Sequence, residues 1–314
     1  MSKAALVVGS VAFDDLDMPS GNFRDVLGGA ATYSCIAASL VSEPGTCRLV
    51  GVVGADFAEA HLDMLRARGV DTAGVERKAG KTFRWHGRYS QDLASRESID
   101  TQLNVFADFR PKIPDAYRKN AVVLLGNIHP KLQLEVLAQV DRDAQTLVMA
   151  DTMNFWITGE PRALADVLAK VDLLVINDEE AQQLAGVKSV AQAARAIRKQ
   201  GPKRLIIKRG EHGALLFDDA GVFFVPGYPL EQVLDPTGAG DTFAGGLAGY
   251  LARTRDRSSH AVRKGMFYAS ALASFCVEGI GAERLLAVKK GDLDERLAAF
   301  TAMVDYGGAL GFVE

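Results

Sequence analysis

The sequence predicts an α/β protein whose mostly parallel central sheet is covered by helices. Short apolar runs recur along the chain, and their length and continuity are typical of strands buried on both faces. Segments with helical spacing separate these runs, as in proteins built from alternating strands and helices. The first run, residues 4–8, ends at Gly9 and Ser10, which suits a buried strand whose end lies at a binding site.

The expected elements follow one another in a regular order. Strands are expected at residues 4–8, 48–53, 122–125, 146–149, 173–176 and 205–208. Helices are expected at residues 30–41, 57–67, 131–140, 162–169 and 190–199. Hairpin strands are expected at residues 208–213 and 217–225, joined by a turn at 218–221, and the chain after Gly240 is expected to be mainly helical.

Two stretches break this alternation. Residues 14–27 are rich in polar and turn-forming side chains, and aromatic and polar residues alternate over 83–106. We expect both to form a small projecting β-sheet, called the lid, bounded by about 12–28 and 82–107. Since no repeat or long linker divides the chain, we expect one domain over 1–314.

Composition disfavours several classes of protein. The chain has 314 residues, a net charge of -3 and a pI near 6.0, so it lacks the basic field that attracts nucleic acid or anionic lipid. Its three cysteines form no paired motif, and no apolar run reaches the roughly 18 residues of a membrane span. We therefore expect a cytoplasmic protein. Walker-type phosphate loops, dinucleotide-binding glycine patterns, histidine metal sites and serine-hydrolase motifs are all missing.

The strongest chemical signal is the sequence DPTGAGD at residues 235–241, just before an apolar helix. Gly238, Ala239 and Gly240 leave successive backbone N–H groups exposed at the positive end of that helix, which suits an anion. Asp241 lies at the same end and can accept a proton as a hydroxyl attacks phosphorus. The pattern favours phosphoryl transfer, although small residues also serve simply to let a helix pack closely.

This heptapeptide resembles the second signature of the ribokinase-like PfkB family of carbohydrate kinases. The resemblance implies a three-layer α/β/α fold and an ATP-dependent phosphotransferase that acts on an alcohol group of a small carbohydrate, with Mg²⁺ as cofactor. It implies that Asp241 is the catalytic base. It also implies that the N–H groups of Gly238, Ala239 and Gly240 stabilise the transferring phosphoryl group.

The amino-terminal part of the chain carries the expected acceptor site. Gly9 and Ser10, followed by Asp14, resemble the family's first-strand motif, whose aspartate holds two substrate hydroxyls. A carboxylate with two acceptor oxygens suits a diol, so Asp14 is the expected substrate anchor. Gly28 and Gly29 resemble the double glycine that lets the backbone approach the substrate. The competing interpretation of Asp14 is a solvated loop residue.

Later residues resemble the family's nucleotide site. Asn177 and Glu180 match the NxxE motif, in which the glutamate organises Mg²⁺ mainly through water. Asn177 also fits the N-cap of a helix with an acidic first turn, and the two interpretations are compatible. Lys208, Gly210 and Gly213 resemble the nucleotide-binding turn, although Lys208 replaces the small hydroxyl residue common there.

The resemblance leaves several questions open. Thr237 is expected on the nucleotide side, and some family members bind a monovalent cation such as K⁺ near Asp235 and Thr237. Ribokinase carries a lysine and an asparagine where this chain has Ala30 and Tyr33, which argues against ribose as the acceptor. A carbohydrate, a nucleoside and a non-catalytic ligand-binding regulator remain alternatives. Exposed strand edges in the lid predict a homodimer through the lid.

Overall fold

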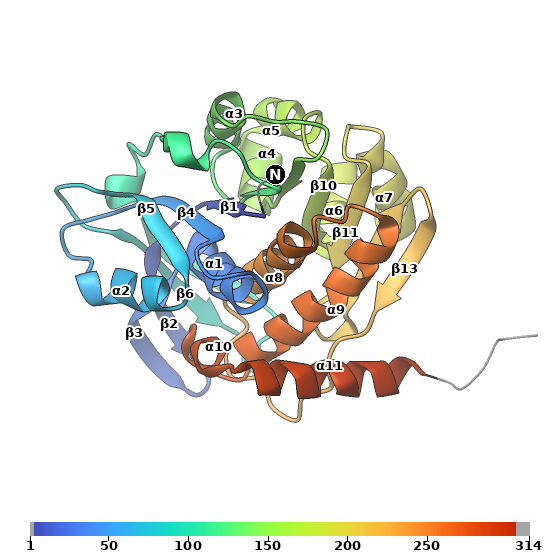
Figure 1. Cartoon of the computed structure of the whole chain (residues 1–314). Helices are drawn as coiled ribbons and strands as arrows, with labels where there is room; N and C mark the ends of the chain where they lie inside the picture. Colours follow the sequence, from blue (N-terminus) through green and yellow to red (C-terminus); the bar gives the residue numbers. More distant parts are fainter. Residues whose placement is uncertain (1–2, 306–314) are drawn as a thin grey trace, which may run out of the picture.

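The computed structural model describes residues 3–305, which form a nine-stranded central sheet and a separate four-stranded sheet (Figure 1). Seven neighbouring strands of the central sheet are parallel, and the last two continue it as an antiparallel hairpin. In spatial order the strands are β13 (Gly221–Val225), β12 (Ala214–Asp218), β11 (Arg204–Lys208), β10 (Leu173–Asn177), β9 (Leu147–Ala150), β8 (Val122–Leu125), β1 (Ala5–Val8), β4 (Cys47–Val53) and β5 (Val70–Arg77).

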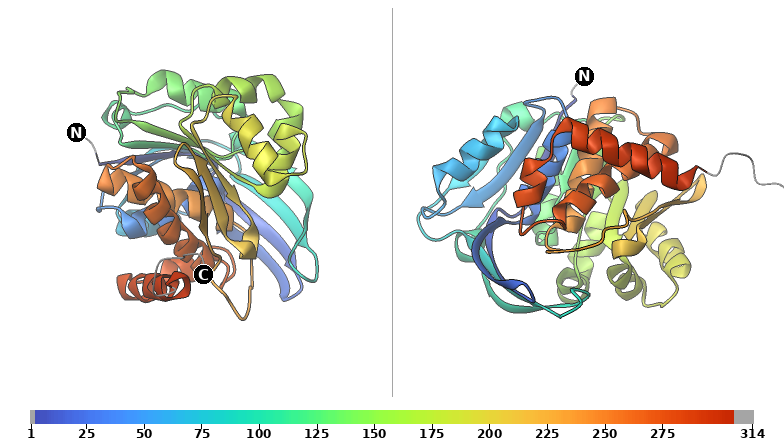
Figure 2. Two further views of the ribbon diagram at one scale, coloured as in Figure 1. Left: turned by 90° about the vertical axis from the view of Figure 1, so that its right-hand side faces the viewer. Right: turned by 90° about the horizontal axis from the view of Figure 1, so that it is seen from below.

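Helices cover both faces of the central sheet, which confirms the three-layer ribokinase-like α/β/α fold (Figure 2, left). One face carries α1 (Ala30–Val41), α2 (Glu59–Ala67), α8 (Ala239–Thr254), α9 (Ser259–Cys276), α10 (Glu283–Ala287) and α11 (Lys290–Val304). The opposite face carries α3 (Pro130–Gln139), α4 (Asn154–Gly159), α5 (Pro161–Leu168), α6 (Asp178–Ala185) and α7 (Val190–Arg198). Every helix within residues 3–305 is too short or too polar to cross a lipid bilayer.

Strand alternation divides the core into two apolar layers. Ala5 and Val7 of β1 pack under α1 and α8, whereas Leu6 and Val8 pack against the helices of the opposite face. All four side chains are fully buried, as expected for a parallel strand covered on both sides. A Cβ atom on Gly245 would lie 2.1 Å from the backbone of Ser34, so glycine lets α8 pack directly on α1.

The predicted strands up to Lys208 are all present, but the region after it differs from the prediction. Residues 208–213 were expected to form a strand, yet Gly210–His212 is a 3₁₀ turn with Gly210 and Gly213 at positive φ. The turn expected at residues 218–221 is present, because Asp219 and Ala220 separate β12 from β13, but the strand before it is residues 214–218 and not 208–213. Strand β5 was not predicted, because its polar residues hide the apolar alternation of this edge strand.

The four-stranded sheet lies within the two segments predicted as the lid. Its spatial order is β3 (Gly21–Gly28), β2 (Ala12–Met18), β6 (Phe83–Tyr89) and β7 (Arg96–Gln102), with β2 and β6 parallel. Figure 2 (right) shows these blue and teal strands curving away from the central sheet. Val105 was expected in a lid strand but lies in the 3₁₀ turn Asn104–Phe106.

Candidate functional site

Most of the predicted site residues gather at the carboxyl edge of the central sheet. Asn177 ends β10 directly beside Lys208, the last residue of β11, and Asp151 follows β9 at the same edge. The connection after β1 leads to α1 on one face, whereas the connection after β8 leads to α3 on the other. Ligands of parallel α/β sheets bind where neighbouring connections diverge in this way.

The start of α8 has the geometry of an anion site. Gly238 adopts φ 75°, and a Cβ atom there would lie 2.5 Å from the ring of Tyr33. The N–H of Ala239 donates to the carbonyl of Pro236 over 3.3 Å, whereas those of Gly238 and Gly240 have no hydrogen-bond partner among residues 3–305. The predicted anion site therefore has two free backbone N–H donors, Gly238 and Gly240, whereas the N–H of Ala239 is engaged in a long hydrogen bond.

Asp241 lies in the first turn of α8 with its side chain partly buried. Burial, followed by the negative charge of Asp151, raises its pKa to about 7, while Lys208 and Arg96 act in the opposite direction. A carboxylate with a pKa near neutrality is well suited to accept a proton at physiological pH. The carbonyl of Asp241 accepts from Ser34 Oγ at 2.9 Å, which fixes the helix start against α1.

Lys208 brings a cation to the same helix end. Its Nζ lies 3.7 Å from Asp151 Oδ2, and a Cβ atom on Gly240 would approach that nitrogen to 2.8 Å. Burial lowers the pKa of Lys208, but Asp151, Glu180 and the base carboxylate raise it by more, so the lysine stays charged. The ammonium thus occupies the region where the family pattern has a small hydroxyl, and its charge suits a phosphate.

Asn177 and Glu180 form a reciprocal capping box at the start of α6. Asn177 Oδ1 accepts from the N–H of Glu180 at 2.8 Å, and Glu180 Oε2 accepts from the N–H of Asn177 at 2.8 Å. Burial, followed by Asp151, raises the pKa of Glu180 to about 7. One glutamate oxygen is therefore held by the cap, and the other accepts no hydrogen bond among residues 3–305.

Asp14 lies on β2 and is almost completely buried. Burial, followed by the charges of Asp235 and Asp241, raises its pKa to about 8. A Cβ atom on Gly28 would lie 2.0 Å from Asp14 Oδ2, so only glycine leaves room for this carboxylate. Gly29 adopts φ 96° and precedes α1, whose first N–H groups bond to Ser10. The alternative of a solvated loop residue is wrong for Asp14.

Thr237 connects the anion loop to the lid. Its Oγ1 lies 2.7 Å from the hydroxyl of Tyr89 at the end of β6, and its N–H donates to Asp235 Oδ1 at 2.8 Å. The other oxygen of Asp235 accepts from the N–H of Gly281. The threonine hydroxyl is therefore bonded to the lid, so its predicted contact with nucleotide would have to use the backbone or displace Tyr89.

The two glycines of the β11–β12 turn differ in their surroundings. Gly213 adopts φ 80°, and a Cβ atom there would lie 2.1 Å from the carbonyl oxygen of Val225, so this glycine is needed for close packing. Gly210 adopts φ 54° but is exposed, with open space around it. Gly210 is thus the more accessible of the two positions for a ligand.

Two charged residues of this region were not predicted. Asp151 is almost buried and influences Glu180, Lys208 and Asp241; its place just after a buried strand was the signal that could have identified it. Arg96 reaches the site from β7, whose seven residues are all exposed and carry no apolar pattern. Sequence periodicity gave no signal for Arg96.

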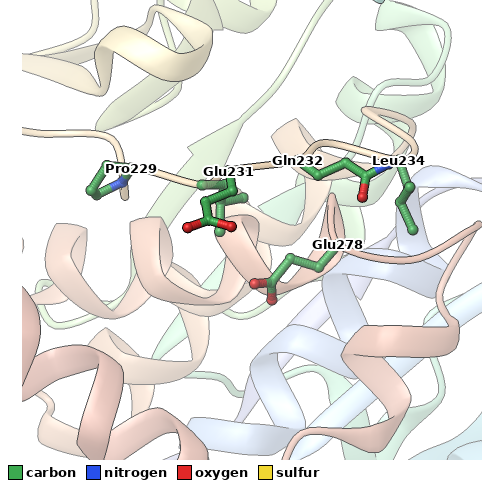
Figure 3. A pocket seen from close by; sticks show the side chains of 6 residues that line it. Pro229, Glu231, Gln232, Leu234 and Glu278 are labelled. Carbon is green, nitrogen blue, oxygen red and sulfur yellow. The ribbon is translucent and has the colours of Figure 1, made fainter.

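A surface hollow of about 350 Å³ lies elsewhere, between the segment before α8 and the end of α9 (Figure 3). It is lined by Pro229, Leu230, Glu231, Gln232, Leu234 and Glu278. Figure 3 shows the carboxylates of Glu231 and Glu278 facing the same space. Since none of the predicted site residues lines this hollow, we assign it no part in the chemistry.

Comparisons with known proteins agree with this geometry. The pfkB family carbohydrate kinase model matches residues 4–287. The cytidine kinase of Thermococcus kodakarensis is 31% identical over 248 residues, which cover 78% of this chain and 87% of that protein. The inositol 3-kinase of Oryza sativa is 30% identical over 310 residues, which cover 91% of this chain and 72% of that protein.

A solved structure has the same fold. The aminoimidazole riboside kinase from Salmonella enterica, complexed with aminoimidazole riboside and an ATP analogue, superposes with a TM-score of 0.77. The match covers 94% of this chain and 99% of that one, at 21% identity. At this identity the likeness shows the fold alone.

Proposed function

Because the chain belongs to the pfkB family of carbohydrate kinases, we propose that it transfers the γ-phosphoryl group of ATP to a hydroxyl of a small carbohydrate. The observation that carries the proposal is the start of α8, where Asp241 lies beside two free backbone donors and the Lys208 ammonium. A proton acceptor and an anion site at one helix end are what phosphoryl transfer to an alcohol requires.

The acceptor is oriented from the lid side of the site. Asp14 offers two oxygens to neighbouring hydroxyls, and Gly28 and Gly29 keep the adjacent backbone free of side chains. Binding a diol would replace the lost hydration of Asp14 with hydrogen bonds and favour its ionised form. The acceptor hydroxyl would then lie between Asp14 and Asp241, whose mutual repulsion already indicates that they are close.

In the transfer step one bond to phosphorus forms, one breaks, and Asp241 receives the released proton. The acceptor oxygen attacks the γ-phosphorus, the bond from that phosphorus to the β–γ bridging oxygen breaks, and Asp241 takes the hydroxyl proton while ADP leaves. The N–H groups of Gly238 and Gly240, with a weaker contribution from Ala239, stabilise the charge on the transferring group. Lys208 adds a cation at the same point.

Glu180 is the residue that would hold Mg²⁺, through water bound to its free oxygen. Its capping bond with Asn177 fixes the carboxylate, so the ion would be positioned by a rigid group. When bound, Mg²⁺ supplies charge neutralisation between the ATP phosphates. We also propose nucleotide contacts at Gly210, Gly213 and Thr237.

A nucleoside is the second candidate acceptor. It is favoured by the similarity to a cytidine kinase and by the aromatic residues Trp85 and Tyr89 on the lid, which offer a surface for a base. The similarity to an inositol 3-kinase favours a carbohydrate or polyol. A non-catalytic regulator is disfavoured because the chain keeps Asp241 in the first turn of α8 and Glu180 in the capping box of α6.

The test is ADP release with ATP and Mg²⁺ against a panel of sugars, polyols and nucleosides, for wild type and Asp241→Asn. We expect one acceptor class to stimulate release, and the mutant to lose a factor of about 100 to 10,000 while binding ATP within a few-fold of wild type. Wild-type turnover in the mutant would refute the assignment of the base. Repeating the assay in Na⁺ and K⁺ salts tests a monovalent cation near Asp235.

Four finer proposals accompany this function. We propose that residues 1–314 work as one domain, that the lid closes over the acceptor, and that the protein acts in the cytoplasm, where its three unpaired cysteines remain reduced. We also propose a homodimer through the outer lid strands β3 and β7, whose edges are unpaired within residues 3–305. A monomer at micromolar concentration in light scattering would refute the dimer.

A further inference from the structure

The β6–β7 hairpin of the lid contacts the loop that begins α8. The hydroxyl of Tyr89 lies 2.7 Å from Thr237 Oγ1, in the anion loop. Arg96 is the residue opposite Tyr89 in this antiparallel pair, and directly opposed residues project from the same face of a sheet. The face of the hairpin that meets the anion loop therefore carries Arg96.

Arg96 has no carboxylate partner among residues 3–305, although its side chain interacts with the hydroxyl of Tyr89. Two other lid arginines are paired, Arg84 with Asp15 at 2.9 Å and Arg88 with Asp17 at 3.6 Å. By contrast, no carboxylate in residues 3–305 lies within 4.0 Å of the Arg96 guanidinium, which rests 5.6 Å from the ring centre of Trp85.

The electrostatic neighbours of Arg96 are the groups assigned to phosphoryl transfer. The surrounding protein lowers its pKa, but Tyr89, Asp241 and Glu180 raise it by more, so the side chain stays charged. Its charge also acts to lower the pKa values of Asp151 and Asp14, both of which burial raises.

We infer that Arg96 is a catalytic residue that contacts the transferring phosphoryl group from the lid, opposite Lys208, which contacts it from the central sheet. The inference rests on the kinase function proposed above. A guanidinium presents several N–H donors in a planar fork that matches phosphate oxygens, and it remains charged at any working pH. Asp241, Asp151 and Glu180 are all carboxylates, so a second cation offsets the repulsion that a phosphate would meet among them.

Because Arg96 lies on the lid, its contact with the phosphoryl group depends on how the β6–β7 hairpin docks on the anion loop. Since Tyr89 and Arg96 share one hairpin, docking of Tyr89 on Thr237 and delivery of Arg96 occur together. The hairpin is docked in the structure, so Arg96 is in place for the third phosphate of ATP before the acceptor binds.

The first test measures binding and does not depend on the acceptor. The chain has two tryptophans, so Trp156→Phe leaves Trp85, which stacks near Arg96, as the fluorescent reporter. In this background we compare a non-hydrolysable ATP analogue with ADP, each with Mg²⁺. Arg96→Met should weaken the analogue about tenfold and ADP by less than twofold, because one charge-assisted contact to the third phosphate is lost.

Arg88→Met is the matched control, since Arg88 lies on the same hairpin beside Tyr89 but is exposed and paired with Asp17. We expect it to change neither affinity. An equal loss of analogue and ADP affinity in Arg96→Met would overturn the inference, as would an unchanged analogue affinity. If wild type shows no acceptor-dependent ADP release, the kinase proposal fails, yet the ratio of the two affinities still decides whether Arg96 reaches the third phosphate.

The second test uses kinetics with the acceptor found in the panel. Arg96→Met should lower kcat about 100-fold or more, with Arg96→Lys between it and wild type. The acidic limb of the kcat profile should also move to higher pH, because Arg96 and Lys208 oppose the effects of burial and Asp151 on the base, Asp241. A rise in the acceptor KM with unchanged kcat and pH profile would assign Arg96 to acceptor recognition and overturn the inference.

Discussion

The backbone N–H of Gly281 donates to Asp235 Oδ2 at 2.7 Å, and this bond ties the segment after α9 to the anion loop. The second oxygen of Asp235 accepts from Thr237, and the carboxylate is fully buried. Asp235→Ala would leave two buried donors without an acceptor, and we expect it to lower the free energy of unfolding by about 2–4 kcal/mol. Urea unfolding measures the loss.

Asp235→Asn is the control for this prediction, because its amide keeps one acceptor oxygen and similar volume. It should lose less stability than Asp235→Ala. Equal stability of Asp235→Ala and wild type would show that the bond to Gly281 does not hold the loop.

The rate of transfer should depend on the ionisation of Asp241. Its pKa is raised to about 7, chiefly by burial, and only the carboxylate form can accept the hydroxyl proton. We therefore expect kcat to fall tenfold per pH unit below about 7 and to level off above it. A kcat profile from pH 5 to 9 at saturating substrates measures this, and a rate independent of pH down to 5 would contradict it.

The buried Asp14 carboxyl should make the free protein less stable in alkali. Its folded pKa is raised to about 8, whereas an unfolded aspartate ionises near 3.9. Between those values the folded state holds the extra proton, so the stability contributed by this group is present at low pH and is lost as pH rises through about 8. Asp14→Asn should therefore increase the free energy of unfolding by about 1–2 kcal/mol at pH 9.

At pH 5 the same substitution should raise stability by a smaller amount, because only the first part of the loss, which runs from about pH 4 to about pH 8, has occurred at that pH. Urea unfolding of wild type and Asp14→Asn at pH 5 and pH 9 measures these effects, and the result at each pH is the control for the other. Acceptor-dependent activity should be lost at both pH values if Asp14 anchors the substrate. An equal gain in stability at pH 5 and pH 9 would mean that ionisation of Asp14 is not the cause.

Gly238 should tolerate no side chain. Its φ of 75° disfavours other residues, and a Cβ atom would enter the ring of Tyr33. Gly238→Ala should lower kcat about 100-fold or more because the anion loop must move. Gly186→Ala is the control, since Gly186 has φ 66° but open space around it. It should cost about 1 kcal/mol of stability and leave kcat unchanged.

Substitutions of the two residues of the α6 capping box should have different effects, one on the stability of the fold and the other on the Mg²⁺ requirement. Asn177→Ala removes the side-chain cap and should lower stability by about 1 kcal/mol. Glu180→Gln keeps an oxygen for the cap but loses the charge, so it should raise the Mg²⁺ concentration needed for half-maximal rate about tenfold. Thermal unfolding and Mg²⁺ titration measure these effects, and an unchanged Mg²⁺ requirement in Glu180→Gln would contradict the proposed role.

The central sheet was predictable because its strands are buried on both faces, as the four apolar residues of β1 are. The hairpin at the far edge was predicted in part: its turn at Asp219 and Ala220 was expected, but its first strand was placed at residues 208–213, where the chain forms a 3₁₀ turn. Strand β5 was missed because the edge position tolerates polar residues. Burial on both faces thus made strands easy to predict, and partial exposure made them hard.

The site was predictable where local sequence determines local structure. Gly238 to Asp241 begin a helix, and Asn177 caps one, so short motifs sufficed. Contacts between distant segments left no such pattern. Tyr89 and Thr237 are 148 positions apart, and the role of Arg96 depends on how the lid folds over the sheet. Lys208 was judged by its departure from a motif, whereas its proposed role rests on how close its Nζ lies to Gly240.

The lid forms its own hydrogen-bonded sheet and shares no ladder with the central one. Substitutions along β2, β3, β6 and β7 therefore leave the pairing of the nine core strands untouched. Natural variation in acceptor preference can accumulate on this accessory layer while the helix end that performs the transfer stays fixed. The same separation offers a route to engineering: exchanging lid segments between relatives, with Tyr89 and Arg96 retained, would test whether the lid sets which alcohol is phosphorylated.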